Sequence, residues 1–135
     1  MRRLHAAFAI AAVVAAIACG SSTSPSPPVN IAGTWNGTVS DSQLGTGTVT
    51  ATINQSNSAV AGTWAASYAN AANNNSGTLA GTVDGSNVSM TLKPSAPGSC
   101  AILLSTTSDG RTMNGNYSTV NCTEIVTGQI KVIWQ

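Results

Sequence analysis

Ala32-Gly33-Thr34-Trp35 recurs letter for letter as Ala61-Gly62-Thr63-Trp64, and recurs without its aromatic residue as Ala80-Gly81-Thr82-Val83. Each copy lies in a run where apolar residues or glycine alternate with hydroxyl-bearing residues. Alternation with a period of two is typical of a β-strand with one buried face. The repeat therefore predicts a meander of similar strands, each bent at a glycine.

The alternation extends over eight segments between residues 31 and 135, with turn-forming residues between them. Asp84-Gly85 and Asp109-Gly110 are hairpin signals, because both residue types tolerate the positive φ that tight turns require. Asn70 to Gly77 is expected to be the longest loop. The contiguous residues Ile102, Leu103 and Leu104 leave the facing of the sixth strand open.

Eight sequence-adjacent strands with short links predict an all-β fold, an eight-stranded antiparallel up-and-down β-barrel, since closure removes the two exposed sheet edges. The outward positions are rich in threonine, serine and asparagine, which argues against a membrane-spanning barrel. Several inward positions are glycines, which permit the sharp coiling of a small barrel: Gly33, Gly37, Gly62, Gly81, Gly115 and Gly128.

An immunoglobulin-like β-sandwich is the alternative fold, because it also consists of short alternating strands. Against it, no tryptophan lies between Cys100 and Cys122, and their separation is short for a bridge between two sheets. The two cysteines flank the hairpin of the sixth and seventh strands, so we expect a disulfide in an oxidising compartment. A metal or redox pair would lack both CxxC spacing and a histidine partner.

Residues 1–18 have the features of a signal peptide, with Arg2 and Arg3 before the apolar run from Leu4 to Ala18. The stretch from Ala16 to Gly20 resembles a bacterial lipobox, which implies that Cys19 becomes a lipidated N-terminus. Cleavage after Ala18 without lipidation, giving a secreted protein with a free thiol, is the alternative.

Residues 19–30 are then the lipidated cysteine and a Ser/Pro-rich tether, and residues 31–135 are the folded domain. This arrangement predicts a cell-envelope protein held to the membrane by its N-terminal lipid. The residues after Cys19 lack the aspartate that retains some lipoproteins at the inner membrane, which favours the outer membrane.

Composition excludes several functions. Only 7% of the residues are charged, and the single histidine, His5, lies in the predicted leader. We therefore expect no nucleic-acid partner, no histidine-based catalysis, no metal site and no cofactor. Asp41 and Glu124 lie outside evident turns, but nothing in the sequence places them together. They are expected to be solvated, and the protein is expected not to be an enzyme.

Gly33-Thr34-Trp35 and the run from Ala59 to Ala71 resemble the first and third strands of avidins, which belong with lipocalins among the eight-stranded calycin-type barrels. The resemblance covers about half of the domain and implies the same fold. The avidin biotin contacts are not matched, since they fall on Gly37, Asp41, Trp64 and Ala66. Biotin binding is therefore not predicted.

The aromatic residues with inward parity are the candidate ligand-binding residues: Trp35, Trp64, Tyr68, Tyr117 and Trp134. Either they fill the barrel, or they line a void left by the inward glycines and alanines. The second interpretation predicts a carrier of a small apolar ligand. The first predicts an interaction or inhibitor module that binds an envelope protein through loops such as Asn70 to Gly77 and Pro94 to Gly98.

Overall fold

The computed structural model describes residues 24–135, so Cys19 and the predicted signal peptide lie outside the described residues. Eight strands and one short 3₁₀ helix follow one another along the chain: β1 (Gly33–Asp41), β2 (Gly45–Ser56), β3 (Ala59–Tyr68), η1 (Ala71–Asn73), β4 (Asn75–Asp84), β5 (Asn87–Pro94), β6 (Ala101–Ser108), β7 (Thr112–Val120) and β8 (Thr127–Trp134).

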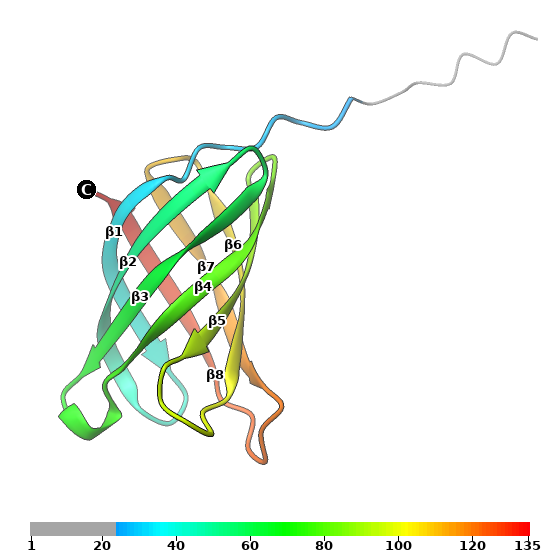
Figure 1. Ribbon diagram of the computed structural model, residues 1–135. Helices are drawn as coiled ribbons and strands as arrows, with labels where there is room; N and C mark the ends of the chain where they lie inside the picture. Colours follow the sequence, from blue (N-terminus) through cyan, green and yellow to red (C-terminus); the bar gives the residue numbers. More distant parts are fainter. Residues whose placement is uncertain (1–23) are drawn as a thin grey trace, which may run out of the picture.

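Each strand pairs antiparallel with the next, and β8 pairs with β1, so the sheet closes on itself (Figure 1). The predicted up-and-down barrel is confirmed. The immunoglobulin-like alternative is wrong, because a sandwich has two separate sheets, whereas here the pairing of β1 with β8 closes a single sheet. Within residues 24–135, no helix is long and apolar enough to cross a membrane.

The inward row of each strand forms the core, as the period-two pattern predicts. The strand that the sequence left open, β6, buries Leu104 and turns Leu103 outward. Its inward row then continues as Thr106 and Ser108, which are buried and hydrogen-bonded to the carbonyls of Val88 and Thr112. Because these inward residues carry hydroxyl groups, the sequence of this strand does not show an alternation of apolar and hydroxyl residues.

Close strand approach explains one of the repeated inward glycines. A Cβ atom on Gly62 would lie 1.9 Å from the carbonyl oxygen of Thr52 on the paired strand β2. Any side chain would therefore push the two strands apart at this bend. The glycine of the repeated Ala-Gly-Thr-Trp stretch thus permits the coiling that closes the barrel.

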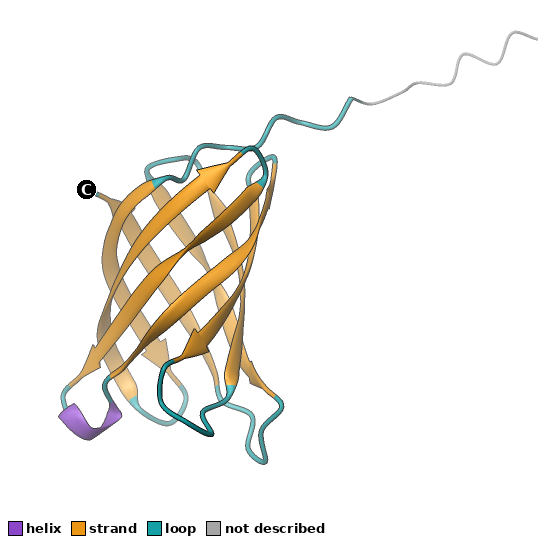
Figure 2. Ribbon diagram, viewed as in Figure 1, coloured by secondary structure: helices purple, strands orange, loops and turns teal. Residues whose placement is uncertain are grey.

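The two ends of the barrel differ in their connections (Figure 2). The tight β2–β3, β4–β5 and β6–β7 hairpins lie at one end, and residues 42–44, 69–74, 95–100 and 121–126 connect strands at the other. The prediction that Asn70 to Gly77 is the longest loop is wrong. Asn75 pairs with Ala66 and Gly77 pairs with Pro94, so β4 begins inside the asparagine-rich stretch.

The hairpin end is covered by the segment from Val29 to Ala32, called the N-terminal arm below, which crosses the barrel before β1 begins (Figure 1). The Val29 N–H donates to the carbonyl of Gly85 at 2.8 Å. The Gln55 side chain accepts from the Ile31 N–H at 2.7 Å and donates to the Val29 carbonyl at 3.0 Å. Ile31 is completely buried. Val29, expected in the tether, therefore packs against the barrel.

The opposite end carries the disulfide. Cys100 precedes β6 and Cys122 follows β7, and the bond joins them across a Cα–Cα distance of 5.7 Å. The expected Cys100–Cys122 pairing is confirmed. It ties the 95–100 connection to the 121–126 connection at the end of the barrel that the N-terminal arm leaves uncovered.

Candidate functional site

The uncovered end contains a cavity of about 160 Å³, called the mouth pocket below. Its deeper wall is apolar and includes Trp64, Leu92 and Leu104, and Tyr68 and Tyr117 also line it. The remaining lining residues are Leu44, Val49, Ala66, Asn73, Asn75, Ile102, Thr119, Val126 and Ile130. Strands β2 to β8 all contribute to the wall. Leu44, Asn73 and Val126 come from the 42–44, 69–74 and 121–126 connections.

Two glycines make room for the two tyrosines. A Cβ atom on Gly128 of β8 would lie 2.3 Å from Cζ of Tyr117, which is its register partner on β7. Likewise, a Cβ atom on Gly47 of β2 would lie 2.8 Å from Cδ1 of Tyr68, its partner on β3. Each ring therefore lies across a glycine of the neighbouring strand, an arrangement that also covers the exposed glycine backbone.

Strand β1 lies between the two strands that carry these glycines, and its residue Asp41 pairs with Gly128. The Tyr117 hydroxyl donates to Oδ2 of Asp41 at 2.6 Å. The other carboxylate oxygen, Oδ1, accepts from the N–H groups of Gln43 at 2.7 Å and Leu44 at 2.9 Å. Asp41 thus closes the β1–β2 turn and holds Tyr117, so the expectation of a solvated carboxylate is wrong.

The Tyr68 hydroxyl lies beside the Tyr117 hydroxyl, and each affects the pKa of the other. A tyrosine hydroxyl has one proton to donate, and that of Tyr117 goes to Asp41. Tyr117 and Asp41 thus form a hydrogen-bonded pair with Tyr68 next to it.

Both tyrosines stay neutral at physiological pH. Burial raises the pKa of Tyr117 far above its usual value, and its hydrogen bond to the Asp41 carboxylate raises that pKa further. Burial also raises the pKa of Tyr68, which outweighs the lowering effect of the neighbouring Tyr117 hydroxyl. The two tyrosines therefore present neutral hydroxyls beside the Asp41 carboxylate.

The centre of the barrel is filled. Between Trp35 and Trp64 lies a cavity of about 30 Å³ whose lining is apolar, with Met90, Met113 and Val132 among its residues. A space of this size is comparable to one water molecule, and it offers no polar partner to hold one. The structure therefore has a plugged centre and a shallow mouth, so each of the two sequence interpretations describes one part of the lumen.

The five candidate aromatic residues are divided between the two ends. Trp64, Tyr68 and Tyr117 meet at the mouth pocket, whereas Trp35 is completely buried and donates its indole N–H to the Ile31 carbonyl at 2.8 Å. Trp134 has inward parity but ends β8 at the rim covered by the arm. Its indole lies against Gly33 and is 48% exposed, so the prediction that it faces the lumen is wrong.

Asp41 is the residue of this site for which the sequence predicted only a solvated carboxylate. It has the same parity as Val39 and Trp35, both buried on the inner face of β1. Extending the alternation by one more inward position would have placed its carboxylate at the rim of the lumen. The adjacent turn residues concealed that signal. Glu124, the other expected solvated carboxylate, is exposed in the 121–126 connection.

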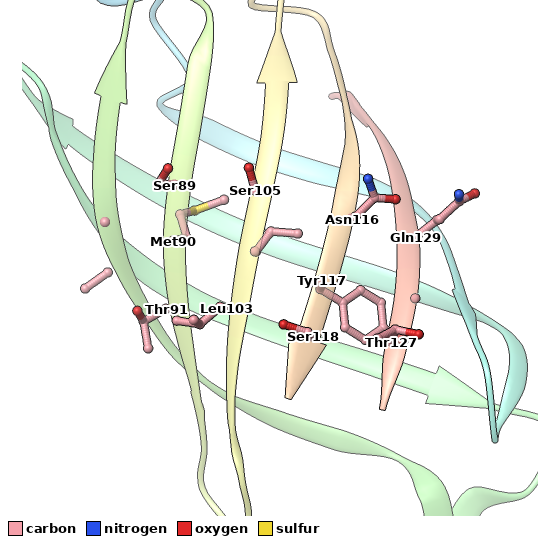
Figure 3. A pocket seen from close by; sticks show the side chains of 14 residues that line it. Ser89, Met90, Thr91, Leu103, Ser105, Asn116, Tyr117, Ser118, Thr127 and Gln129 are labelled. Carbon is pink, nitrogen blue, oxygen red and sulfur yellow. The ribbon is translucent and has the colours of Figure 1, made fainter. Parts of the chain in front are cut away.

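A larger hollow lies on the outer face, where a trough of about 720 Å³ crosses β4 to β8 (Figure 3). Its outward residues carry short hydroxyl or carboxamide side chains apart from Ala80 and Leu103: Ser89, Thr91, Ser105, Asn116, Ser118, Thr127 and Gln129. None of the trough's described residues is charged or projects an aromatic ring outward. The mouth pocket, which combines aromatic walls with the hydrogen bond from Tyr117 to Asp41, is therefore the candidate functional site.

Residues 24–135 contain no group of three or more histidine, cysteine, aspartate or glutamate side chains that could hold a metal ion. The chemistry at the mouth is therefore that of aromatic surfaces, two phenols and one carboxylate. These groups can bind and orient a small molecule.

Comparison with known proteins gives fold-level similarity. No protein-family model and no curated protein sequence matches the chain. Among solved structures, EF1p2_mFAP2b bound to DFHBI has a TM-score of 0.68 at 12% identity, with 78% of this chain and 94% of that chain covered. A redesigned β-barrel, b11L5F_LGL, has a TM-score of 0.62 at 15% identity, with 78% and 91% covered. This chain is similar to both in its eight-stranded barrel, and the resemblance to avidins stays a prediction.

Proposed function

We propose that this protein is a non-catalytic binding module that takes one small apolar or aromatic group into the mouth pocket. The observation that carries the proposal is the meeting of Trp64, Tyr68 and Tyr117 around a cavity that is open at one end of an otherwise filled barrel. Aromatic walls with a few placed polar groups are typical of small-molecule sites. The central cavity formed by the described residues is much smaller, at about 30 Å³.

The size of the pocket limits the ligand. Drug-sized molecules occupy cavities of roughly 300 to 1,000 Å³, and the mouth pocket measures about 160 Å³. An apolar cavity of roughly 150 Å³ is sufficient for benzene. We therefore expect the pocket to enclose one ring or a short apolar chain, while the rest of a larger ligand extends past the loops.

Two further points support the proposal. EF1p2_mFAP2b, which has a similar fold, is bound to DFHBI, so a barrel of this shape can hold a small molecule. The described chain also reaches the barrel at the end covered by the N-terminal arm (Figure 1). If Cys19 is lipidated, as we propose, the mouth faces away from the membrane and toward ligands of the cell envelope.

Tryptophan fluorescence tests this function, because the described tryptophans occupy different positions. Toluene, phenol and DFHBI are titrated into the wild-type protein and into the Trp64→Phe and Trp134→Phe variants. We expect saturable quenching in the wild type and in Trp134→Phe, and loss of that signal in Trp64→Phe. A linear, unsaturable response to all three compounds would contradict a pocket at the mouth.

Exposed apolar loop residues favour a second function, the binding of an envelope protein. Leu44 is 40% exposed and Ile125 is 69% exposed. Their connections are joined by a hydrogen bond from the Ser42 N–H to the Thr127 carbonyl at 3.0 Å. Such a partner would cover the mouth. Cross-linking in envelope preparations should then give a defined adduct that Leu44→Ser/Ile125→Ser loses and Ile133→Ser, changed on the outer wall, retains.

A further inference from the structure

The hydrogen bond between Tyr117 and Asp41 determines which polar groups of this tyrosine face a ligand. The Tyr117 hydroxyl donates its proton to Asp41 at 2.6 Å. A hydroxyl whose proton is used can only accept further hydrogen bonds. Tyr117 therefore presents lone pairs to a ligand and has no proton to offer.

The charged side chains nearest the mouth are negative, so they also favour hydrogen-bond donors and cations. Asp41 carries a carboxylate directly behind the two phenols, and Glu124 lies in a connection at the same end. Among the described residues that line the pocket, none is a lysine or arginine. Lys93, near this end on β5, is exposed and occupies an outward position. The Asp41 carboxylate therefore gives the pocket a negative electrostatic potential. No lysine or arginine among the described lining residues offsets it.

The remaining polar groups at the rim are neutral. Asn73 and Asn75 contribute carboxamides, and the side-chain oxygen of Asn75 already accepts from the Ser76 N–H at 2.9 Å. The Thr119 hydroxyl accepts from the Val126 N–H at 2.8 Å. These side chains can form hydrogen bonds with a ligand, but they carry no positive charge that would offset Asp41 behind Tyr117.

Resting on the proposed function, we infer that the mouth pocket selects ring compounds that carry an N–H or O–H donor, ammonium compounds above all, and rejects anions. The ring packs against Trp64, and its donor points to the free lone pairs of Tyr117. A cation gains further, because aromatic faces and a nearby carboxylate both attract positive charge. An anionic ring compound would meet the lone pairs of Tyr117 and the charge of Asp41, and no lysine or arginine among the described lining residues would offset them.

A series of single-ring probes separates these cases: benzylamine as its ammonium form, phenol, anisole, toluene and benzoate. Their binding is followed at pH 7 by fluorescence and by NMR shifts of the Trp64 indole. We expect benzylammonium and phenol to bind roughly tenfold more tightly than anisole and toluene, with benzoate weakest. Equal affinities for phenol, anisole and toluene would overturn donor selection while leaving the binding function intact. No saturable binding of any probe would instead contradict the proposed function.

Matched acidic variants identify the residue responsible. Asp41→Asn keeps an oxygen that can accept from Tyr117 but removes the charge, whereas Glu124→Gln removes a charge from an exposed loop at the same end. We expect Asp41→Asn to weaken benzylammonium binding about tenfold and to leave toluene binding unchanged, and Glu124→Gln to alter neither by more than about twofold. Toluene binding reports that the pocket is intact. Equal losses of benzylammonium affinity in both variants would show a general surface-charge effect and overturn the role of Asp41.

Discussion

At each end of the barrel an aromatic ring lies against a glycine of the neighbouring strand, but only one of the two ends is covered. At the closed end, the Trp134 indole lies against Gly33, and the N-terminal arm then buries Ile31 over Trp35. At the mouth, Tyr117 lies across Gly128, but no segment of the described chain covers it. The described chain thus covers one end with its own backbone and leaves the other uncovered.

The difference also separates stability from function. The closed end is held by backbone and side-chain hydrogen bonds around Ile31 and Trp35, whose complete burial contributes to the folding free energy. The mouth is held by a disulfide and by the part-buried hydrogen bond between Tyr117 and Asp41. Substitutions of Ile31 or Trp35 at the closed end should therefore change stability, and those of the pocket side chains at the mouth should change binding with a smaller effect on stability.

The largest effect is expected for Trp35→Ala. Truncation of a fully buried tryptophan leaves a cavity that the strands cannot fill, so the free energy of unfolding should fall by about 3 to 5 kcal/mol. Urea denaturation followed by circular dichroism measures it. Trp134→Ala, made at the half-exposed tryptophan of the same end, is the control and should cost much less. Equal losses would show that the arm does not make this end a core.

Ile31→Ala tests the arm itself. Because Ile31 is completely buried, its truncation should lower the free energy of unfolding by about 2 to 4 kcal/mol. The control, Ile125→Ala at the mouth, changes an exposed side chain and should stay within about 0.5 kcal/mol. If both isoleucines prove equally dispensable, the segment before β1 is a tether and not a seal.

Removal of the disulfide is expected to cost about 2 to 4 kcal/mol, because the Cys100–Cys122 bond restricts the unfolded chain across a separation of 22 residues. The Cys100→Ala/Cys122→Ala variant and the wild type are unfolded in urea with and without a thiol reductant. The reductant should destabilise the wild type and have no effect on the variant. A wild type that is insensitive to reductant, although its bond is shown to be reduced, would contradict the expectation.

The smallest effect on stability is expected for Tyr117→Phe, about 1 kcal/mol at pH 7 for the lost hydrogen bond. The pKa of Tyr117 is raised in the folded state, so its contribution is present below about pH 10, where tyrosine in the unfolded chain is protonated. The contribution is lost as the pH rises above that value, because the unfolded state ionises first. Urea midpoints between pH 7 and 11 should therefore fall less steeply in the variant.

Much of the fold could be predicted from the sequence, because an eight-fold run of alternating residues leaves few ways to bury the apolar rows. The repeated glycines, the hairpin signals and the cysteine positions point to the same barrel. The site was harder to predict. Trp64, Tyr68 and Tyr117 have inward parity, but parity does not show how far along the barrel axis a side chain lies. That position distinguishes these three residues from Trp35 and Trp134.

The roles of Val29 and Asp41 were missed for a related reason. Each lies just beyond a strand pattern, where the serine- and proline-rich segment or the turn residues dominate the local signal. Their structural roles depend on long-range partners, Gly85 for Val29 and Tyr117 for Asp41. Contacts between residues this far apart leave no trace in local periodicity.

The location of a bound ring tests the contrast between the two ends most directly. Crystals of the protein soaked with 4-bromophenol would reveal the ring through the anomalous signal of bromine. The account predicts a bromine peak at the mouth beside Trp64, with the phenol oxygen hydrogen-bonded to Tyr68 or Tyr117. Bromine bound in the outer trough of β4 to β8 or under the N-terminal arm, with the mouth empty, would contradict it.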